Sequence, residues 1–128
     1  MKNQLRSNWK VLAPIDLAAD PEIPVRRAID VASSFGGDLT LLHVIDRGAR
    51  RDQTVWPSHA LDESQGSCAI HRLVLPGTIP QTVVRYAEFI NADLLVMTAE
   101  YWRPWARFWK RSNTRSILEA TKRPIFFT

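Results

Sequence analysis

The chain has 128 residues, with 17 basic and 13 acidic side chains, a formal net charge of +4 and a single cysteine. That length suits one domain with its own core, and one cysteine excludes a disulfide framework and a cysteine-based zinc site. No apolar run approaches the roughly 18 residues of a membrane span, and residues 1–10 lack the apolar stretch of a signal peptide. We therefore expect a cytoplasmic α/β or α+β domain.

The charge is unevenly distributed along the chain. Residues 99–123 hold seven basic and two acidic side chains, whereas the rest of the chain holds ten basic and eleven acidic ones. The same stretch contains Trp102, Trp105 and Trp109, three of the five tryptophans. The basic and aromatic character is therefore concentrated in one segment.

The N-terminal part predicts an arm, a strand and a helix. Residues 1–8 are polar and indicate a flexible arm in front of one domain over residues 9–128. Residues 9–15 form an apolar run, which predicts a buried strand, with Pro14 near its end where a sheet hydrogen bond can be spared. A helix is predicted to start at residues 20–24, whose prolines and acids suit a first turn.

The end of that first helix is also marked. Its apolar face recurs at spacings of three and four residues, and Gly36 and Gly37 then form a C-cap. The residues of this face are Val25, Ala28, Ile29, Ala32 and Phe35.

The middle of the chain predicts two further strands. Residues 39–45 are almost continuously apolar, so we expect a central strand buried on both faces. Residues 47–66 are polar, rich in turn residues and interrupted by Pro57, and no helix is expected there. Residues 67–75 alternate more strongly and indicate a strand at an edge of the sheet.

The C-terminal part predicts two helices and two strands. Thr78 caps a helix after the turn at residues 76–77, and residues 93–97 form the next strand. Ser112 caps a last helix, and Ile125–Phe127 is a final short strand. The inward face of the first of these helices is Val83, Val84, Ala87 and Ile90, and the last helix carries Ile117 and Leu118.

Strands that alternate with helices predict a parallel sheet covered on both faces. Because crossovers are right-handed, we expect a doubly wound, five-stranded, Rossmann-like α/β domain. Ligands in such folds bind beyond the carboxyl ends of the strands. Asp16, the residues after Val44 and the loop after Met97 are therefore expected around one crevice.

Several strings, in this order, resemble the universal stress protein family. The run from Val11 to Asp16 resembles that family's first strand, and residues 39–44 resemble its second. Gly77, with the helix after it and residues 92–97, resembles the third helix and fourth strand. Residues 116–118 and 123–126 resemble the end of the domain. The resemblance covers residues 9–128. It implies the fold of this family, which in its nucleotide-binding members holds an adenine nucleotide.

Members of that family that bind ATP carry a glycine signature after the fourth strand. It reads Gly, two residues, Gly, nine residues, then Gly and Ser or Thr. On this sequence Thr98, Tyr101 and Arg111 fall at the glycines, and Ser112 keeps the hydroxyl. Glycines serve there because phosphates approach bare backbone N–H groups, so their loss predicts a degenerate site without a cofactor.

The alternative is ATP with magnesium held by a modified loop, since the start of the last helix can attract an anion. The residues expected to line that site are Asp16, Val44, Thr98, Ser112 and Thr114. The resemblance places Asp16 near the ribose. A solvated acid at the end of a strand or a turn cap is an equally good interpretation of Asp16.

Nothing in the sequence indicates catalysis. His43 lies inside an apolar strand without a partner cysteine or carboxylate pattern, so a hydrogen-bonded core histidine is the preferred interpretation. His59 and His71 have no metal-ligand spacing, and Cys68 is interpreted as a strand residue. We predict that the protein is not an enzyme and holds no metal.

The segment 101–111 carries three competing hypotheses. Its tryptophans are spaced as on one face of a short helix and could fill the crevice that ATP would otherwise occupy. They could instead form a partner interface, where Trp and Arg are favoured. A third possibility is a surface for anionic membranes or nucleic acid. The interface residues proposed are Trp102, Trp105, Trp109, Arg103 and Arg107.

The last strand has an edge to protect, and the family commonly dimerises through this strand. Ile125, Phe126 and Phe127 are therefore expected to form a homodimer interface. The leading hypothesis is a dimeric, non-enzymatic stress or regulatory domain that contacts an unknown protein partner, without nucleic acid or a membrane span. The competing hypotheses are an adenine-nucleotide-binding stress protein and a binder of anionic membranes or nucleic acid.

Overall fold

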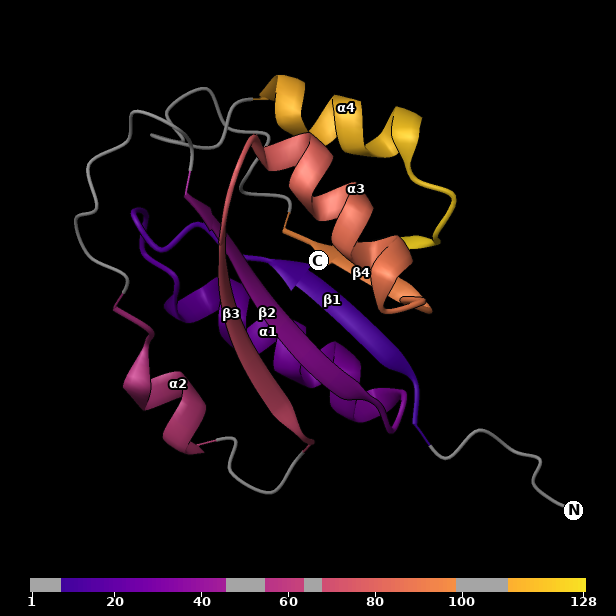
Figure 1. Ribbon diagram of the computed structural model, residues 1–128. Coiled ribbons are helices and arrows are strands. Elements are labelled where there is room, and N and C mark those ends of the chain that lie inside the picture. Colours follow the sequence, from indigo (N-terminus) through magenta and orange to yellow (C-terminus); the bar gives the residue numbers. More distant parts are fainter. Residues whose placement is uncertain (1–7, 46–54, 64–67, 99–110) are drawn as a thin grey trace, which may run out of the picture.

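The computed structural model describes residues 8–45, 55–63, 68–98 and 111–128. The elements in chain order are β1 (Lys10–Pro14), α1 (Glu22–Ser34), β2 (Asp38–Ile45), α2 (Ser58–Glu63), β3 (Ile70–Pro76), α3 (Ile79–Phe89), β4 (Leu94–Met97), α4 (Arg111–Ala120) and β5 (Ile125–Phe127) (Figure 1). The strands form one five-stranded parallel sheet in the order β3-β2-β1-β4-β5. The predicted fold class is confirmed.

Two hydrophobic clusters lie on opposite faces of this sheet. Helices α1 and α2 close one face, and α3 and α4 close the other (Figure 1). Alternate residues of a strand point to opposite faces, so Leu39 and Leu41 of β2 join the first cluster while Leu42 and Val44 join the second. One strand therefore supplies both cores.

The turn after α1 confirms the predicted glycine cap. Gly36 adopts φ +64°, the left-handed conformation that favours glycine, and the Gly37 amide donates to the Ala32 carbonyl at 2.9 Å. Phe35 is the C-cap residue itself and is 38% exposed. Its ring packs against Trp9 with centroids 4.8 Å apart, so it lies beside the helix face on which we expected it.

Helix α2 is a correction, because no helix was expected between residues 47 and 66. Six residues are too few for a stable helix in isolation, and their stability comes from packing. Ala60 is fully buried, and Trp56 and Leu61 pack against the first cluster. The sequence shows no full apolar face here because the helix contacts the core through so few residues.

Smaller differences concern the ends of elements. Cys68 precedes β3, and α4 begins at Arg111, so Ser112 lies in its first turn and is not its cap. Thr78 occupies the N-cap position of α3, but its side chain makes no capping hydrogen bond. Strand β2 is interior, yet Thr40 and His43 are only half-buried, so its burial on both faces is incomplete.

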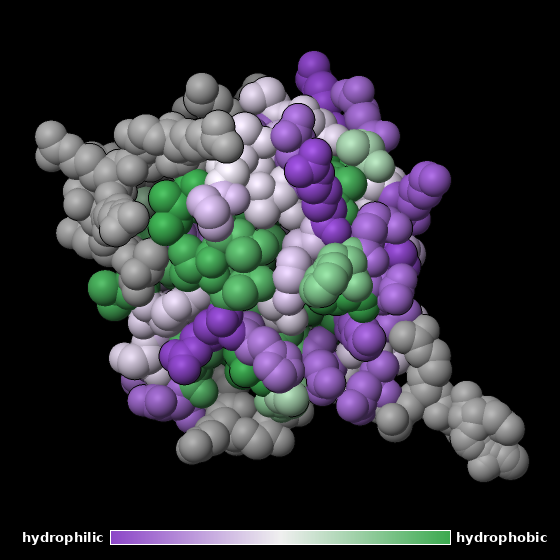
Figure 2. All heavy atoms as spheres, in the orientation of Figure 1, coloured by the Kyte–Doolittle hydropathy of each residue, from purple (hydrophilic) through white to green (hydrophobic). Residues whose placement is uncertain are grey.

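Strand β3 is an edge strand, as predicted. The space-filling view shows hydrophobic side chains gathered over its upper part, beside α3 (Figure 2). Three consecutive residues in this half of β3, Leu73, Val74 and Leu75, are half-buried. Exposed His71 and Arg72 lie at its start, which is a common way to keep an edge from pairing with another chain.

Candidate functional site

The strand order defines one topological switch point. From β1 the chain builds outward through β2 and β3 on one side and through β4 and β5 on the other, so the switch lies between β1 and β4. Open α/β sheets bind ligands outside the carboxyl ends of the strands at this point. Asp16 lies two residues beyond β1 and Thr98 directly follows β4, so two predicted site residues lie here.

Asp16 is a buried carboxylate. Only 6% of the residue is exposed, and its Oδ1 accepts a hydrogen bond from the Ala18 amide at 3.0 Å. Burial raises the pKa of the Asp16 carboxyl, while the Ala18 amide and nearby His43 act in the opposite direction. The turn-cap interpretation is confirmed, and the interpretation as a solvated acid is wrong.

His43 connects β2 to the loop after β1. Its Nδ1 lies 3.1 Å from the Ile15 carbonyl oxygen and 3.3 Å from the Leu17 amide nitrogen. One tautomer donates to the carbonyl and the other accepts from the amide, so Nδ1 is satisfied by the backbone in either form. This geometry supports a structural role, as the sequence predicted.

The other predicted ligand residues differ in their surroundings. Thr98 is 5% exposed, and within the described residues its hydroxyl has no hydrogen-bond partner. Val44 and Thr114 are buried, with Val44 in the second core cluster, whereas Ser112 is exposed. The structure thus brings a buried carboxylate and a buried hydroxyl to the switch point, a pair suited to hydrogen bonding a polar ligand.

Two further predictions concern surfaces. Tyr101, Trp102, Arg103, Trp105, Arg107 and Trp109 lie outside the described residues. Strand β5 lies at the edge of the sheet, with Phe126 43% and Phe127 39% exposed and Ile125 half-buried.

Among the described residues, no helix is long and apolar enough to cross a membrane, and no group of three or more potential metal ligands occurs.

A groove at the opposite end of the strands was not predicted. It has a volume of about 470 Å³ and lies between α3 and the amino-terminal halves of β2 and β3. The available sequence signal is the change from Leu42 and Val44 to Thr40 on one face of β2, which marks where a helix stops covering the strand. This change in polarity indicates a groove only once the position of α3 above the sheet is known.

The strand order and the helices on both faces define a doubly wound α/β domain with one topological switch point. The sequence pattern of the Universal stress protein family matches residues 8–127, and the chain belongs to this family. No curated protein matches the chain significantly.

Solved structures of this family share the fold. One, a universal stress protein in complex with cAMP, superposes with a TM-score of 0.71 at 18% identity, covering 96% of this chain and 98% of that one. UspA from Lactobacillus plantarum gives 0.69 at 18% identity, with 95% and 98% covered. A protein from Archaeoglobus fulgidus in complex with dAMP gives 0.68 at 17% identity, with 95% and 98% covered.

Proposed function

We propose that this protein is a non-enzymatic stress or regulatory domain that acts as a homodimer and through contacts with a partner protein, without binding ATP. The observation that carries this proposal is β5, a strand at the sheet edge whose two terminal phenylalanines are exposed. Large exposed apolar side chains beside a strand edge favour association.

The dimer would be built by pairing β5 with its copy across a two-fold axis. Such an interface is isologous, so each copy presents the same strand and the two sheets become continuous. Phe126 of each copy would then lose its contact with water. Burial of apolar surface contributes about 25 cal/mol per Å², so two copies of one exposed aromatic residue add appreciably to affinity.

Sedimentation or light scattering over a range of concentrations tests the dimer. We expect a dimer at micromolar concentrations, and we expect Phe126→Asp to shift it to the monomer because a charge would be buried at the interface. Val55→Asp is the control, since Val55 is 70% exposed but lies near α2, away from β5. A monomeric parent protein, or a dimer that tolerates Phe126→Asp, would contradict the interface.

The inference that ATP does not bind is based on the residue at the first glycine position of the family's signature. Thr98 stands where ATP-binding relatives have a glycine, and its side chain is buried. A Cβ at such a position keeps a phosphate away from the backbone N–H groups that would hold it. Tyr101 and Arg111 replace the other two glycines.

A titration with ATP and magnesium tests this inference. We expect neither the melting temperature nor the tryptophan fluorescence to change at millimolar nucleotide, because only a ligand that binds the native state raises stability. The variant with glycine at positions 98, 101 and 111 should gain a saturable response. A saturable response of the parent protein would instead favour the second candidate function.

That second candidate is an adenine-nucleotide-binding stress protein. Two observations favour it: Asp16 and Thr98 are buried together at the switch point, and structures of the same fold contain cAMP and dAMP. The nucleotide would be held by Asp16, Val44, Thr98, Ser112 and Thr114 without the glycines. Asp16→Ala should then abolish the response to nucleotide while the protein stays folded.

The partner surface in the leading proposal includes the tryptophan segment. Trp102, Trp105 and Trp109, with Arg103 and Arg107, have the composition of interface anchors. Replacing the three tryptophans by serine should abolish capture of the partner from cell extract, while the dimer formed through β5 persists. Loss of both together would place the tryptophans in the core.

A further inference from the structure

The groove between α3 and the sheet lies far from the switch point. Its residues come from the starts of β1, β2 and β3 and from the C-terminal part of α3, whereas Asp16 and Thr98 lie beyond the other ends of the strands. Its volume of about 470 Å³ falls within the range of roughly 300–1,000 Å³ that small-molecule sites occupy. A ligand in this groove would therefore not contact Asp16 or Thr98 at the switch point.

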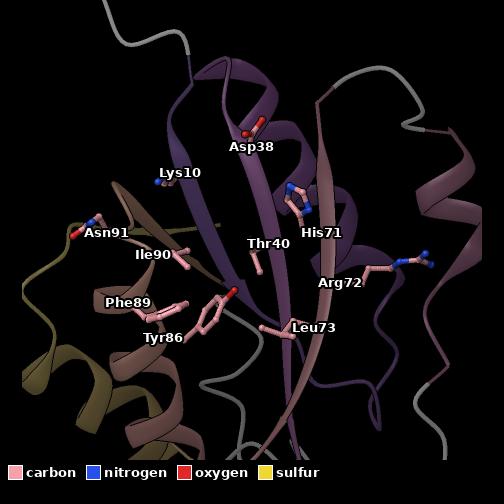
Figure 3. Close-up of a pocket in the computed structure, with 10 residues that line it drawn as sticks. All are labelled: Lys10, Asp38, Thr40, His71, Arg72, Leu73, Tyr86, Phe89, Ile90 and Asn91. Atoms are coloured by element: carbon pink, nitrogen blue, oxygen red, sulfur yellow. The ribbon is translucent and has the colours of Figure 1, made fainter.

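One side of the groove is aromatic. Tyr86 and Phe89 of α3 have ring centroids 5.9 Å apart and an interplanar angle of 37°. Phe89 is 80% exposed, although it is large and apolar, and Leu73 of β3 points toward Tyr86 from the opposite side (Figure 3). Tilted rings at this spacing offer a surface on which a further aromatic ring packs favourably.

The other end of the groove carries opposite charges. Lys10 and Asp38 are register partners on the adjacent strands β1 and β2, and both line the groove. Within the described residues no ion pair joins them, and the Asp38 carboxylate accepts one long hydrogen bond, from the Asn8 side-chain nitrogen at 3.4 Å. Both charged groups can therefore still meet a ligand. A ligand with one positive and one negative group a few ångströms apart would match this pair, since charge-assisted hydrogen bonds are the strong ones.

The two ends are close enough for one small molecule. Thr40, on the floor of the groove, follows Asp38 by two residues, about 7 Å along an extended strand at 3.3 Å per residue. His71 is the register partner of Thr40, and its ring lies between the charged end and the aromatic side (Figure 3). The Arg72 side chain points away from the other labelled side chains (Figure 3), which leaves Lys10 as the basic side chain at this end of the groove.

We propose that this groove binds a free aromatic amino acid. The ring packs against Tyr86 and Phe89, the carboxylate faces Lys10, and the ammonium faces Asp38. Because Lys10 is exposed and Asp38 is only half-buried, solvent screens both charges, and the affinity is in the millimolar range. The proposal does not depend on whether ATP binds, because it uses none of the residues at the switch point.

The test is a titration of the isotope-labelled protein with L-phenylalanine, followed by amide chemical shifts. We expect saturable shifts confined to the starts of β1, β2 and β3 and the end of α3. Phenylacetate lacks the ammonium and phenethylamine lacks the carboxylate, so each should bind about threefold or more weakly than the amino acid. L-alanine should not saturate.

Variants locate the site. Phe89→Ala should weaken binding by about three- to tenfold, because an aromatic pair contributes roughly 0.5–1.5 kcal/mol beyond its area. Lys10→Gln should weaken binding of the amino acid and of phenylacetate but leave binding of phenethylamine unchanged. Asp38→Asn should weaken binding of the amino acid and of phenethylamine but leave binding of phenylacetate unchanged. The control is Leu118→Ala, an exposed apolar residue of α4 outside the groove, which should bind like the parent protein.

Three results would overturn the proposal. These are the absence of localised shifts at millimolar phenylalanine, unchanged affinity in Phe89→Ala, and equal affinity for the amino acid and its two analogues. Tighter binding of N-acetylphenylalanine amide than of phenylalanine would also overturn it, since a peptide side chain of a partner would then be the natural occupant.

Discussion

The two faces of the sheet are closed to different extents. On the first face α1 and α2 cover the strands, and the β2 positions Leu39 and Leu41 are both fully buried. On the second face α3 and α4 cover Leu42 and Val44, but Thr40 is half-buried in the open groove. The polarity of a strand position therefore follows the helix above it, and the uncovered part of this sheet is where the proposed ligand would bind.

The largest expected effect compares neighbouring residues of β2 on the two faces. Leu41→Ala should lower the free energy of unfolding by about 2–5 kcal/mol, because it leaves a cavity in the closed core. Thr40→Val should change it by less than about 0.5 kcal/mol, since the open face does not confine its shape. Urea denaturation measures both, and a large loss in Thr40→Val would show that the second face is as closed as the first.

The next effect concerns the turn that closes the first face after α1. A Cβ on Gly37 would lie 2.6 Å from the Trp9 backbone oxygen, so Gly37→Ala must move the backbone and should cost about 1–3 kcal/mol. Gly36 has open space around it but needs φ +64°, so Gly36→Ala should cost about 1 kcal/mol. Thermal and urea unfolding check this order, and the reverse order would show that conformation matters more than packing here.

The comparison of the two faces also explains what could be predicted from the sequence. Strand and helix positions followed from periodicity because α1, α3 and β2 each carry a full apolar face. The position of helix α2 did not follow from periodicity, because in the part of the chain that the structure describes α2 reaches the first cluster through Ala60 and Leu61, with Trp56 just before it. Asp16 was found through its place after a strand, but its burial depends on the loop that folds over it.

The groove could not be predicted because its residues are far apart in the sequence. Lys10 and Asp38 meet only through the register of β1 and β2, and Phe89 joins them only when α3 packs on the sheet. Each residue alone has the appearance of an ordinary surface position. The parallel pairing brings the two opposite charges together, and the packing of α3 on the sheet adds the aromatic pair.

A third prediction concerns Asp16, which lies just beyond the carboxyl end of β1, between the helices that cover the two faces. Its pKa is raised by burial, so the native state holds the proton more tightly than the unfolded chain and stability falls as the pH rises from 3.8 through the folded pKa. Asp16→Asn keeps an oxygen for the Ala18 amide and removes the buried charge. The variant should be more stable than the parent at neutral pH, and the difference should vanish below pH 3.8.

Urea denaturation at several pH values measures this effect. Stability of Asp16→Asn equal to or below that of the parent at pH 7 would mean that the carboxylate is better solvated than its burial indicates. It would also weaken the case that Asp16 is a buried hydrogen-bonding group for a polar ligand at the switch point.

The smallest expected effect is the difference in stability between the loss of two surface ion pairs, Arg123–Glu88 and Arg26–Glu22. Arg123, before β5, donates from Nε and Nη2 to the two Glu88 oxygens of α3 at 2.8 and 2.9 Å, and from Nη1 to the Ala92 carbonyl at 3.2 Å. On α1, Arg26 and Glu22 approach only to 3.8 Å. Bidentate geometry is the condition under which a surface pair contributes to stability, so Arg123→Gln should destabilise the protein more than Arg26→Gln.

The pH dependence separates these two pairs further. The Arg123 hydrogen bond lowers the pKa of the Glu88 carboxyl from its ordinary 4.5, so the pair's contribution is complete above that value and is lost as the pH falls through the folded pKa. The curves for Arg123→Gln and the parent should therefore converge in acid, apart from the Ala92 contact. A constant difference at every pH would assign the effect to that carbonyl contact, and the fastening of α3 to the β5 edge would then depend on the backbone and not on Glu88.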